Sequence, residues 1–166
     1  MAYELVETSW VVEPGYVCVP GEPVHLAAVV SSGIAVTVYD RKRKRGGMAH
    51  YVRPYREGHR STPLFAAPSI VTLVKILSSS GSRKRHWEVY LYGGAQNPDC
   101  SRHVEGLGDK NVAVGLEILE KLGVPVAGTD VGGRRGRKII FHTGSGETAI
   151  ARVDRLRSSD WYPEVV

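Results

Sequence analysis

The segment that decides the fold reads Ser31-Ser32-Gly33-Ile34-Ala35-Val36-Thr37-Val38-Tyr39-Asp40, and after a basic run at 41–45 it continues Gly46-Gly47-Met48-Ala49-His50. Its β-branched residues predict a strand, the basic run predicts a tight connection, and the second half predicts a shorter strand. Two strands joined in this way bring the start of the first near the end of the second. A residue near position 33 therefore faces His50, which is the arrangement of a nucleophile and its base. Position 33, however, is a glycine.

The bulk composition is that of an ordinary globular domain. The chain has 166 residues, of which 42% are hydrophobic and 23% charged, and this favours one domain with a real core. We expect a single domain over 1–166, with its core at about 8–153 and a tail at 154–166. The longest apolar runs fall far short of the roughly 20 residues that a membrane span needs, and the N-terminus does not resemble a signal peptide. A cytoplasmic location is the expectation.

Cysteine and histidine usage gives little support to a disulfide or a metal site. The two cysteines, Cys18 and Cys100, lie far apart in the sequence, and we expect both to be reduced. The six histidines do not pair at metal-ligand spacing. We therefore expect no metal and no cofactor.

Basic residues are clustered. The net charge is +5, and three basic blocks stand at 41–45, 83–86 and 134–138. One interpretation is that these are solvated turns between strands. The other is a surface that attracts an acidic partner, whether nucleic acid, membrane headgroups or an acidic protein. No aromatic residues interleave with the blocks, which weighs against single-stranded nucleic acid.

The pattern along the chain predicts an α+β fold. Strands are predicted at 4–13, 16–19, 24–30, 34–39, 47–52, 87–92, 124–127, 138–142 and 147–153. A helix is predicted to start at Pro68 or Ser69 and to end before Gly81, and a second to run from an N-cap at Asn111 to a C-cap at Gly123. A polar loop is predicted at 95–110 and a turn at 129–133. The result is a layered α/β sandwich of mostly antiparallel or mixed strands, covered by two helices.

Several short motifs occur along the chain in an order that is characteristic of one family. They are Ser32-Gly33-Ile34-Ala35-Val36, Asp40, Gly47-Met48-Ala49-His50, Gly93-Gly94-Ala95, Leu107-Gly108-Asp109-Lys110-Asn111 and Asp130-Val131-Gly132-Gly133-Arg134-Arg135-Gly136-Arg137. Each is weak alone, but as an ordered set they resemble the CheD family of chemotaxis proteins, the glutamine deamidases of bacterial chemoreceptors. The resemblance extends from about residue 8 to residue 153.

The resemblance implies a fold like the catalytic domain of the cytotoxic necrotizing factor toxins, with a cysteine–histidine site. In such a site the cysteine thiolate attacks a glutamine carboxamide on a chemoreceptor helix. The histidine keeps the thiol deprotonated and protonates the departing ammonia, and water then cleaves the thioester to leave glutamate. A threonine upstream assists. A CheC-type phosphatase binds family members at the same surface, and no cofactor is implied.

Carried over residue by residue, the resemblance keeps the base and loses the nucleophile. The family histidine falls on His50, the family cysteine on Gly33, and the family threonine on Ala27. Glycine supplies no nucleophile, so we expect no cysteine-dependent deamidation from this position. His50 is then either a retained base or a structural histidine bonded to the backbone.

Other motif residues are expected near the site as contacts for a substrate or partner. The serines Ser31 and Ser32 precede the vacant position. The glycines would let a receptor or CheC segment approach closely, and the arginines would pair with carboxylates of an acidic partner. These residues are Gly93, Gly94, Gly132, Gly133, Arg134, Arg135 and Arg137.

Three functions stay open on the sequence. The first is a catalytically degenerate regulator that binds chemoreceptor helices or CheC. The second is a working deamidase in which Cys100, Cys18 or Ser31 replaces the lost cysteine and acts with His50. On a strand Ser32 would point away from the site, whereas Ser31 would share the face of position 33. The third is a basic module that binds a polyanion.

Overall fold

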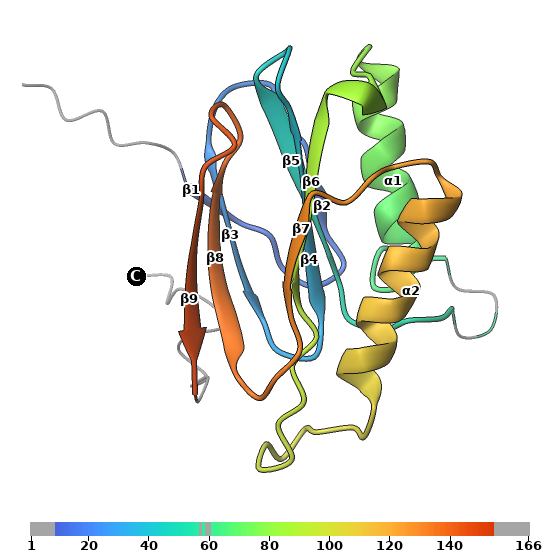
Figure 1. The fold of residues 1–166 in the computed structure, drawn as a ribbon, viewed down its shortest axis with the longest axis vertical. Coiled ribbons are helices and arrows are strands. Elements are labelled where there is room, and N and C mark those ends of the chain that lie inside the picture. Colours follow the sequence, from blue (N-terminus) through green and yellow to red (C-terminus); the bar gives the residue numbers. More distant parts are fainter. Residues whose placement is uncertain (1–8, 57, 59–60, 155–166) are drawn as a thin grey trace, which may run out of the picture.

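The computed structural model describes residues 9–56, 58 and 61–154. Three layers lie side by side in it: a four-stranded sheet, a five-stranded sheet and a pair of helices (Figure 1). This is the α+β layered sandwich that the sequence predicts. Along the described chain the elements are β1 (Ser9–Val11), β2 (Val17–Cys18), β3 (His25–Val30), β4 (Ile34–Asp40), β5 (Arg45–Tyr51), α1 (Ala66–Ser79), a 3₁₀ turn (Lys84–His86), β6 (Trp87–Gly93), α2 (Leu107–Lys121), β7 (Gly128–Val131), β8 (Gly136–His142) and β9 (Thr148–Val153).

The two sheets differ in strand order and in what packs against their faces. The first has the strand order β1-β3-β8-β9 and the second β2-β5-β4-β6-β7. Neighbouring strands are antiparallel except for the parallel pairs β1–β3 and β6–β7. The first sheet packs on one face of the second, and α1 and α2 cover the other face (Figure 1). The second sheet is therefore the central layer.

Strand β4 is buried on both sides because it runs through the middle of that central layer. Ile34, Val36 and Val38 pack towards the helices, whereas Ala35 belongs to the core between the sheets. A strand covered on both faces has no need of polar alternation. This is why the segment 34–38 is apolar apart from Thr37, which is itself buried.

The β4–β5 hairpin has the geometry that its sequence predicts. Its register pairs Ile34 with Tyr51 and Ala35 with His50, and at the other end Asp40 with Arg45. The start of β4 thus lies beside the end of β5, and the basic turn stands at the opposite end of the hairpin.

Three predictions in the second half of the chain are wrong. Asn111 is not an N-cap: α2 begins at Leu107 after Gly106, which adopts a left-handed φ of 74°. Asp109 and Lys110 lie in the first turn of α2, but because they are polar, their sequence looks like the end of a loop. The predicted strand at 124–127 is irregular, and the adjacent strand β7 occupies Gly128–Val131 instead. The turn predicted at 129–133 is shorter, because residues 129–131 belong to the polar strand β7 at the edge of its sheet. Gly132, with a positive φ, remains in the turn.

The remaining differences are small. Helix α1 begins at Ala66, so Pro68 lies in its first turn, where a proline costs no hydrogen bond. Of the first strand predicted at 4–13, residues 9–11 form β1 and residues 12–13 are irregular, while residues 4–8 and the tail from 155 lie outside the described part of the chain. Within the described residues, no helix combines the length and apolar character that a membrane crossing requires.

Candidate functional site

Gly33 and His50 face each other at the open end of the β4–β5 hairpin. A β-carbon built on Gly33 would lie 3.6 Å from Nε2 of His50. The φ of Gly33 lies outside the left-handed range, so its backbone suits an L-residue. The same β-carbon would lie 3.0 Å from the carbonyl oxygen of Tyr51 and 3.0 Å from Cγ1 of Val52. A side chain fits here only if these neighbours yield slightly, and it would point at the imidazole.

The orientation of the His50 ring is fixed by the backbone of residue 12. Nδ1 of His50 lies 2.9 Å from the carbonyl oxygen of Val12. Because a carbonyl only accepts hydrogen bonds, Nδ1 carries the proton and Nε2 presents its lone pair towards position 33. Burial lowers the pKa of His50, and the bond to Val12 opposes this only in part. The ring is therefore neutral at physiological pH, as a general base must be.

Asn111 ties together the two chain segments that meet at the site. Its Nδ2 donates to the carbonyl oxygens of Ser32 at 2.9 Å and of Val52 at 3.0 Å. Its own backbone carbonyl accepts the hydroxyl of Tyr51 at 2.6 Å. The side chain is fully buried. Asn111 thus holds the residue before Gly33 and the residues after His50 in fixed positions.

The sequence reasoning missed this role because it assigned Asn111 to a helix cap. A signal was present, since Gly108, Asn111 and Gly115 recur at the spacing of one helix face. All three are buried in α2. A β-carbon on Gly115 would collide with the Tyr51 hydroxyl, so the small residues let α2 approach the end of β5 closely.

Glycines from two other motifs lie against Gly33 or beside it. The N–H of Gly94 donates to the carbonyl of Gly33 at 3.0 Å, and the N–H of Gly132 donates to that of Gly93 at 2.9 Å. Gly93 has a φ of 118°, and a β-carbon on it would collide with the Gly33 carbonyl oxygen. Gly133 lies alongside, because its carbonyl accepts the N–H of Gln96 at 2.7 Å. These glycines give the site a wall made of backbone.

Ser31 and Ser32 contribute backbone contacts, and both side chains are half-buried. The carbonyl of Ser31 accepts the N–H of Ala95 at 2.7 Å. Ala27 also acts through its backbone, because its carbonyl accepts the N–H of Val12 at 2.7 Å. The side chain of Ala27 alternates with those of core residues 26 and 28, so it lies on the outer face of the first sheet. Ala27 is therefore connected to His50 through Val12.

The two cysteines lie in different parts of the fold. Cys18 pairs with Met48 across β2 and β5 and is half-buried, and burial raises the pKa of its thiol. The thiol is therefore protonated at neutral pH, which makes it a poor nucleophile. Cys100 is exposed in the segment between β6 and α2. In the part of the chain that the structure describes, no hydrogen bond joins either thiol to the imidazole.

The third basic block is largely paired with carboxylates. Arg137 is 3% exposed and contacts Asp130 at 3.2 Å. Arg134 pairs with Asp99, and Arg135 pairs with Asp154 at 2.7 Å; all four of these side chains are exposed. Arg137 thus stabilises the sheet from within, and Arg134 and Arg135 are the members of this block that a partner can reach.

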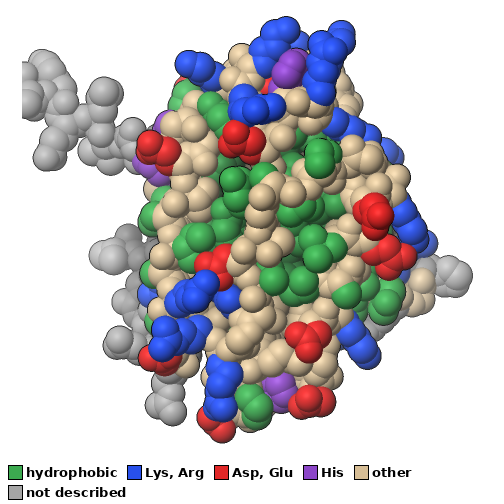
Figure 2. Space-filling model, in the orientation of Figure 1, with side chains coloured by type: hydrophobic (Ala, Val, Ile, Leu, Met, Phe, Trp, Pro, Cys, Tyr) green, Lys and Arg blue, Asp and Glu red, His purple; other side chains and the backbone are tan. Residues whose placement is uncertain are grey.

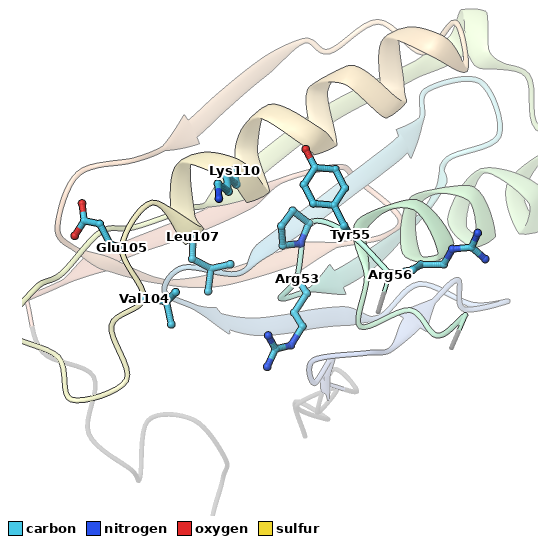
Figure 3. A pocket seen from close by; sticks show the side chains of 8 residues that line it. Arg53, Tyr55, Arg56, Val104, Glu105, Leu107 and Lys110 are labelled. Atoms are coloured by element: carbon cyan, nitrogen blue, oxygen red, sulfur yellow. The ribbon is translucent and has the colours of Figure 1, made fainter. Parts of the chain in front are cut away.

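A shallow hollow of about 250 Å³ borders the site. Arg53 and Lys110 line it, and they follow Val52 and precede Asn111 in the chain. Its lining residues are Arg53, Pro54, Tyr55, Arg56, Val104, Glu105, Leu107 and Lys110. Their cationic groups point in different directions (Figure 3). The hollow is therefore an uneven, partly apolar surface beside the site rather than an anion pocket, and no cluster of three potential metal ligands occurs among the described residues.

Comparison with known proteins places the chain in a family. The family model for CheD, described as CheD chemotactic sensory transduction, matches residues 54–152. The chain is 33% identical to the probable chemoreceptor glutamine deamidase CheD 1 of Anaeromyxobacter dehalogenans, over 80% of this chain and 77% of that protein. It is 35% identical to the probable CheD deamidase of Pyrococcus horikoshii, over 75% and 79% of the two chains. It is 31% identical to that of Trichlorobacter lovleyi, over 84% and 87%. This chain belongs to the CheD family.

Proposed function

We propose that this CheD-family chain binds the cytoplasmic helices of chemoreceptors without deamidating their glutamines. The observation that carries the proposal is the pairing of a competent base with an absent nucleophile. His50 presents Nε2 to position 33, where a β-carbon would lie 3.6 Å away, and that residue is Gly33.

The chemistry explains why this one replacement matters. Deamidation through a thiolate forms a carbon–sulfur bond and breaks the carbon–nitrogen bond of the carboxamide. The imidazolium gives its proton to the departing ammonia, and water then replaces the sulfur. In this chain Nε2 of His50 faces a glycine, which has no proton to give and no atom that can attack. The base therefore has no reaction partner in the protein.

The rest of the site supports binding. Asn111 still locks Ser32 and Val52, and the glycine backbone still packs around Gly33. Exposed Arg134 and Arg135 flank this surface and can pair with carboxylates on an acidic helix. The family resemblance makes a CheC-type phosphatase a second partner for the same surface, so that binding would titrate the phosphatase. Either role would be carried out in the cytoplasm.

A relocated nucleophile is the competing proposal, and it has less support. Cys18 is half-buried with a raised thiol pKa, and Cys100 is exposed. Ser31 is half-buried, and it is the backbone of this residue that is fixed, by the N–H of Ala95. A serine also needs an adjacent base to become nucleophilic.

The experiment is to incubate the wild-type protein with a purified chemoreceptor cytoplasmic fragment and to measure both binding and glutamine-to-glutamate conversion by mass spectrometry. We expect binding without conversion. The variant Arg134→Glu/Arg135→Glu should weaken binding, whereas Lys75→Glu/Arg102→Glu, which makes the same change in charge at two exposed positions, should not. Conversion by wild type that disappears in His50→Ala would overturn the proposal in favour of a relocated nucleophile.

A further inference from the structure

The first two basic blocks meet at the end of the molecule opposite Gly33. Nη2 of Arg41 donates to the carbonyl of Arg85 and Nε to that of His86, both at 3.3 Å. Nη1 of Arg43 donates to the carbonyl of Ser80 at 2.9 Å. Lys and Arg side chains gather at this end, over the β4–β5 turn and the segment before β6 (Figure 2). We call this surface the basic end and define it by its six exposed cations: Arg41, Lys42, Arg43, Lys44, Arg83 and Arg85.

A buried carboxylate holds the basic end in shape. Asp40 is fully buried and accepts the backbone N–H groups of Lys42 at 2.9 Å and of Arg43 at 3.0 Å. It also accepts the hydroxyl of Ser82, which in turn accepts Nε1 of Trp87 at 2.7 Å. One side chain thus fixes both basic segments relative to each other, so that the backbone that carries the cations is in place before any partner arrives.

Positive charge at this surface is little neutralised. The guanidinium groups of Arg41 and Arg43 are held by backbone carbonyls, which leaves their charge in place. Within the described residues, ion pairing of the six cations is limited to Arg41 with Glu88 at 3.8 Å, between two exposed side chains. Arg134, Arg135 and Arg137 of the third block, by contrast, each pair with an aspartate.

The backbone of Lys44 is an independent observation: a basic side chain occupies a position where it lowers local conformational stability. Its φ is 51°, and it is the one non-glycine residue with a positive φ in the described part of the chain. Glycine or asparagine adopts this conformation at lower cost than lysine does. The turn instead carries a fourth consecutive basic residue at the position where glycine would suit the backbone best.

We propose that the basic end docks on the surface of an anionic phospholipid bilayer. The cations stand on the tip of a turn and a short 3₁₀ segment, which suits a flat charged surface. Clusters of four to eight Lys and Arg residues beside a membrane span or on an amphipathic helix bind anionic lipid through the same attraction of charges. The inference rests on none of the chemistry at Gly33, because β4 separates the two ends by about 23 Å, from seven residues at roughly 3.3 Å each.

Two other polyanions fit the surface less well. Single-stranded nucleic acid is bound by stacking on exposed aromatic rings, whereas Trp87 is buried and the Tyr39 hydroxyl is bonded to the Gly144 carbonyl. A duplex groove admits a helix or a ribbon, but β4 and β5 are covered by the layers of the sandwich and expose only their turn. An acidic protein would seek apolar anchors among the cations. In the described chain, none of the large exposed hydrophobic residues lies at 41–45 or 83–88.

The test is co-sedimentation of the full-length protein with phosphatidylcholine vesicles that contain one-third phosphatidylserine, against pure phosphatidylcholine vesicles. We expect binding to the anionic vesicles alone, lost at about 0.5 M salt, where the screening length is a few ångströms. The variant Lys42→Gln/Lys44→Gln/Arg85→Gln should bind roughly 100-fold more weakly, because each basic residue at the surface contributes several-fold. The charge-matched control Arg102→Gln/Lys110→Gln/Arg152→Gln should bind within about threefold of wild type.

A second variant separates binding from folding. Lys44→Gly should raise the melting temperature, since it relieves the left-handed backbone, yet weaken vesicle binding by roughly fivefold for one charge. Equal weakening in the two triple variants, or equal binding to neutral vesicles, would overturn the proposal. So would binding to duplex DNA or to polyglutamate at physiological salt without binding to the anionic vesicles, which would reassign the surface to nucleic acid or to an acidic protein.

Discussion

Nδ1 of His50 lies 2.9 Å from the carbonyl oxygen of Val12, and this bond decides which nitrogen of the ring faces Gly33. Val12 is itself held by the carbonyl of Ala27. A histidine oriented through its Nδ1 proton, with a free Nε2 lone pair, is arranged as a general base. The hydrogen bond that would orient the histidine of a cysteine–histidine site is thus present in a chain that has no cysteine at position 33.

The first prediction concerns pH. Burial lowers the pKa of His50 in the folded state, so the unfolded chain binds the proton more readily. Stability should therefore be complete above the ordinary histidine pKa of about 6.5 and should fall as the pH drops below it, by at most about 1.4 kcal/mol per pH unit for one proton. Urea denaturation at a series of pH values measures this.

The matched variant for that experiment is His50→Gln, whose amide can still donate to Val12. It should remove this part of the pH dependence between about pH 6.5 and 5. An unchanged slope in His50→Gln would show that another group titrates. His86→Gln is the companion variant, because the pKa of this more solvent-accessible histidine at the basic end is also lowered, and it should remove a smaller part of the same pH dependence.

The second prediction concerns Asn111. Asn111→Ala leaves the half-buried carbonyls of Ser32 and Val52 without this donor, so we expect a loss of about 2–4 kcal/mol from two hydrogen bonds and a small cavity. Glu117→Ala on the exposed face of the same helix should change the free energy of unfolding by less than about 0.5 kcal/mol. Chemical denaturation of both variants is the measurement. A loss in Asn111→Ala no larger than in Glu117→Ala would contradict the positioning role.

The third prediction separates two glycines that both have a positive φ. A β-carbon on Gly93 would strike the Gly33 carbonyl, whereas one on Gly132 would meet nothing within 4 Å. Gly132→Ala should therefore cost only the left-handed backbone penalty of about 1–2 kcal/mol. Gly93→Ala adds a backbone clash and should cost about 2 kcal/mol more. Similar melting temperatures for the two variants would show that the wall around Gly33 is looser than the contacts indicate.

The sequence predicts well wherever a local pattern determines the structure. The β4–β5 hairpin follows from its apolar run and basic turn, and the meeting of Gly33 with His50 follows from antiparallel pairing. It predicts poorly where long-range packing decides. Asn111 looks like a cap because its partners, Ser32 and Val52, are more than 50 residues away. Strand β7 is polar and is stabilised by pairing with β6, which no local pattern shows.

Charge blocks show the same limit. The runs at 41–45, 83–86 and 134–138 look alike in the sequence. The fold joins the first two into one surface and pairs the third with Asp99, Asp130 and Asp154. The difference depends on which carboxylates come near in three dimensions. The hollow beside the site could not be predicted from the sequence either. Its lining comes from residues 53–56 and 104–110, which only the fold brings together.

The central claim is that the loss of the nucleophile at Gly33 is what abolishes the chemistry, even though the family threonine is also replaced, by Ala27, and Gly33→Cys tests it. A β-carbon at this position faces Nε2 of His50, and the crowding by Val52 Cγ1 at 3.0 Å can be relieved in Gly33→Cys/Val52→Ala if the single variant folds poorly. Gly33→Ala is the control for the added β-carbon, and Gly33→Cys/His50→Ala is the control for the base. Circular dichroism and the rate of thiol alkylation at neutral pH report folding and thiolate formation in each variant.

The decisive measurement is the mass of a chemoreceptor cytoplasmic fragment after incubation with wild type, Gly33→Cys and Gly33→Cys/His50→Ala. We predict no glutamine-to-glutamate conversion by wild type, clear conversion by Gly33→Cys, and its loss in the double variant. Conversion by wild type itself would contradict the account. So would a folded Gly33→Cys that binds the fragment, yet whose thiol alkylates no faster with His50 than without it and which converts no glutamine.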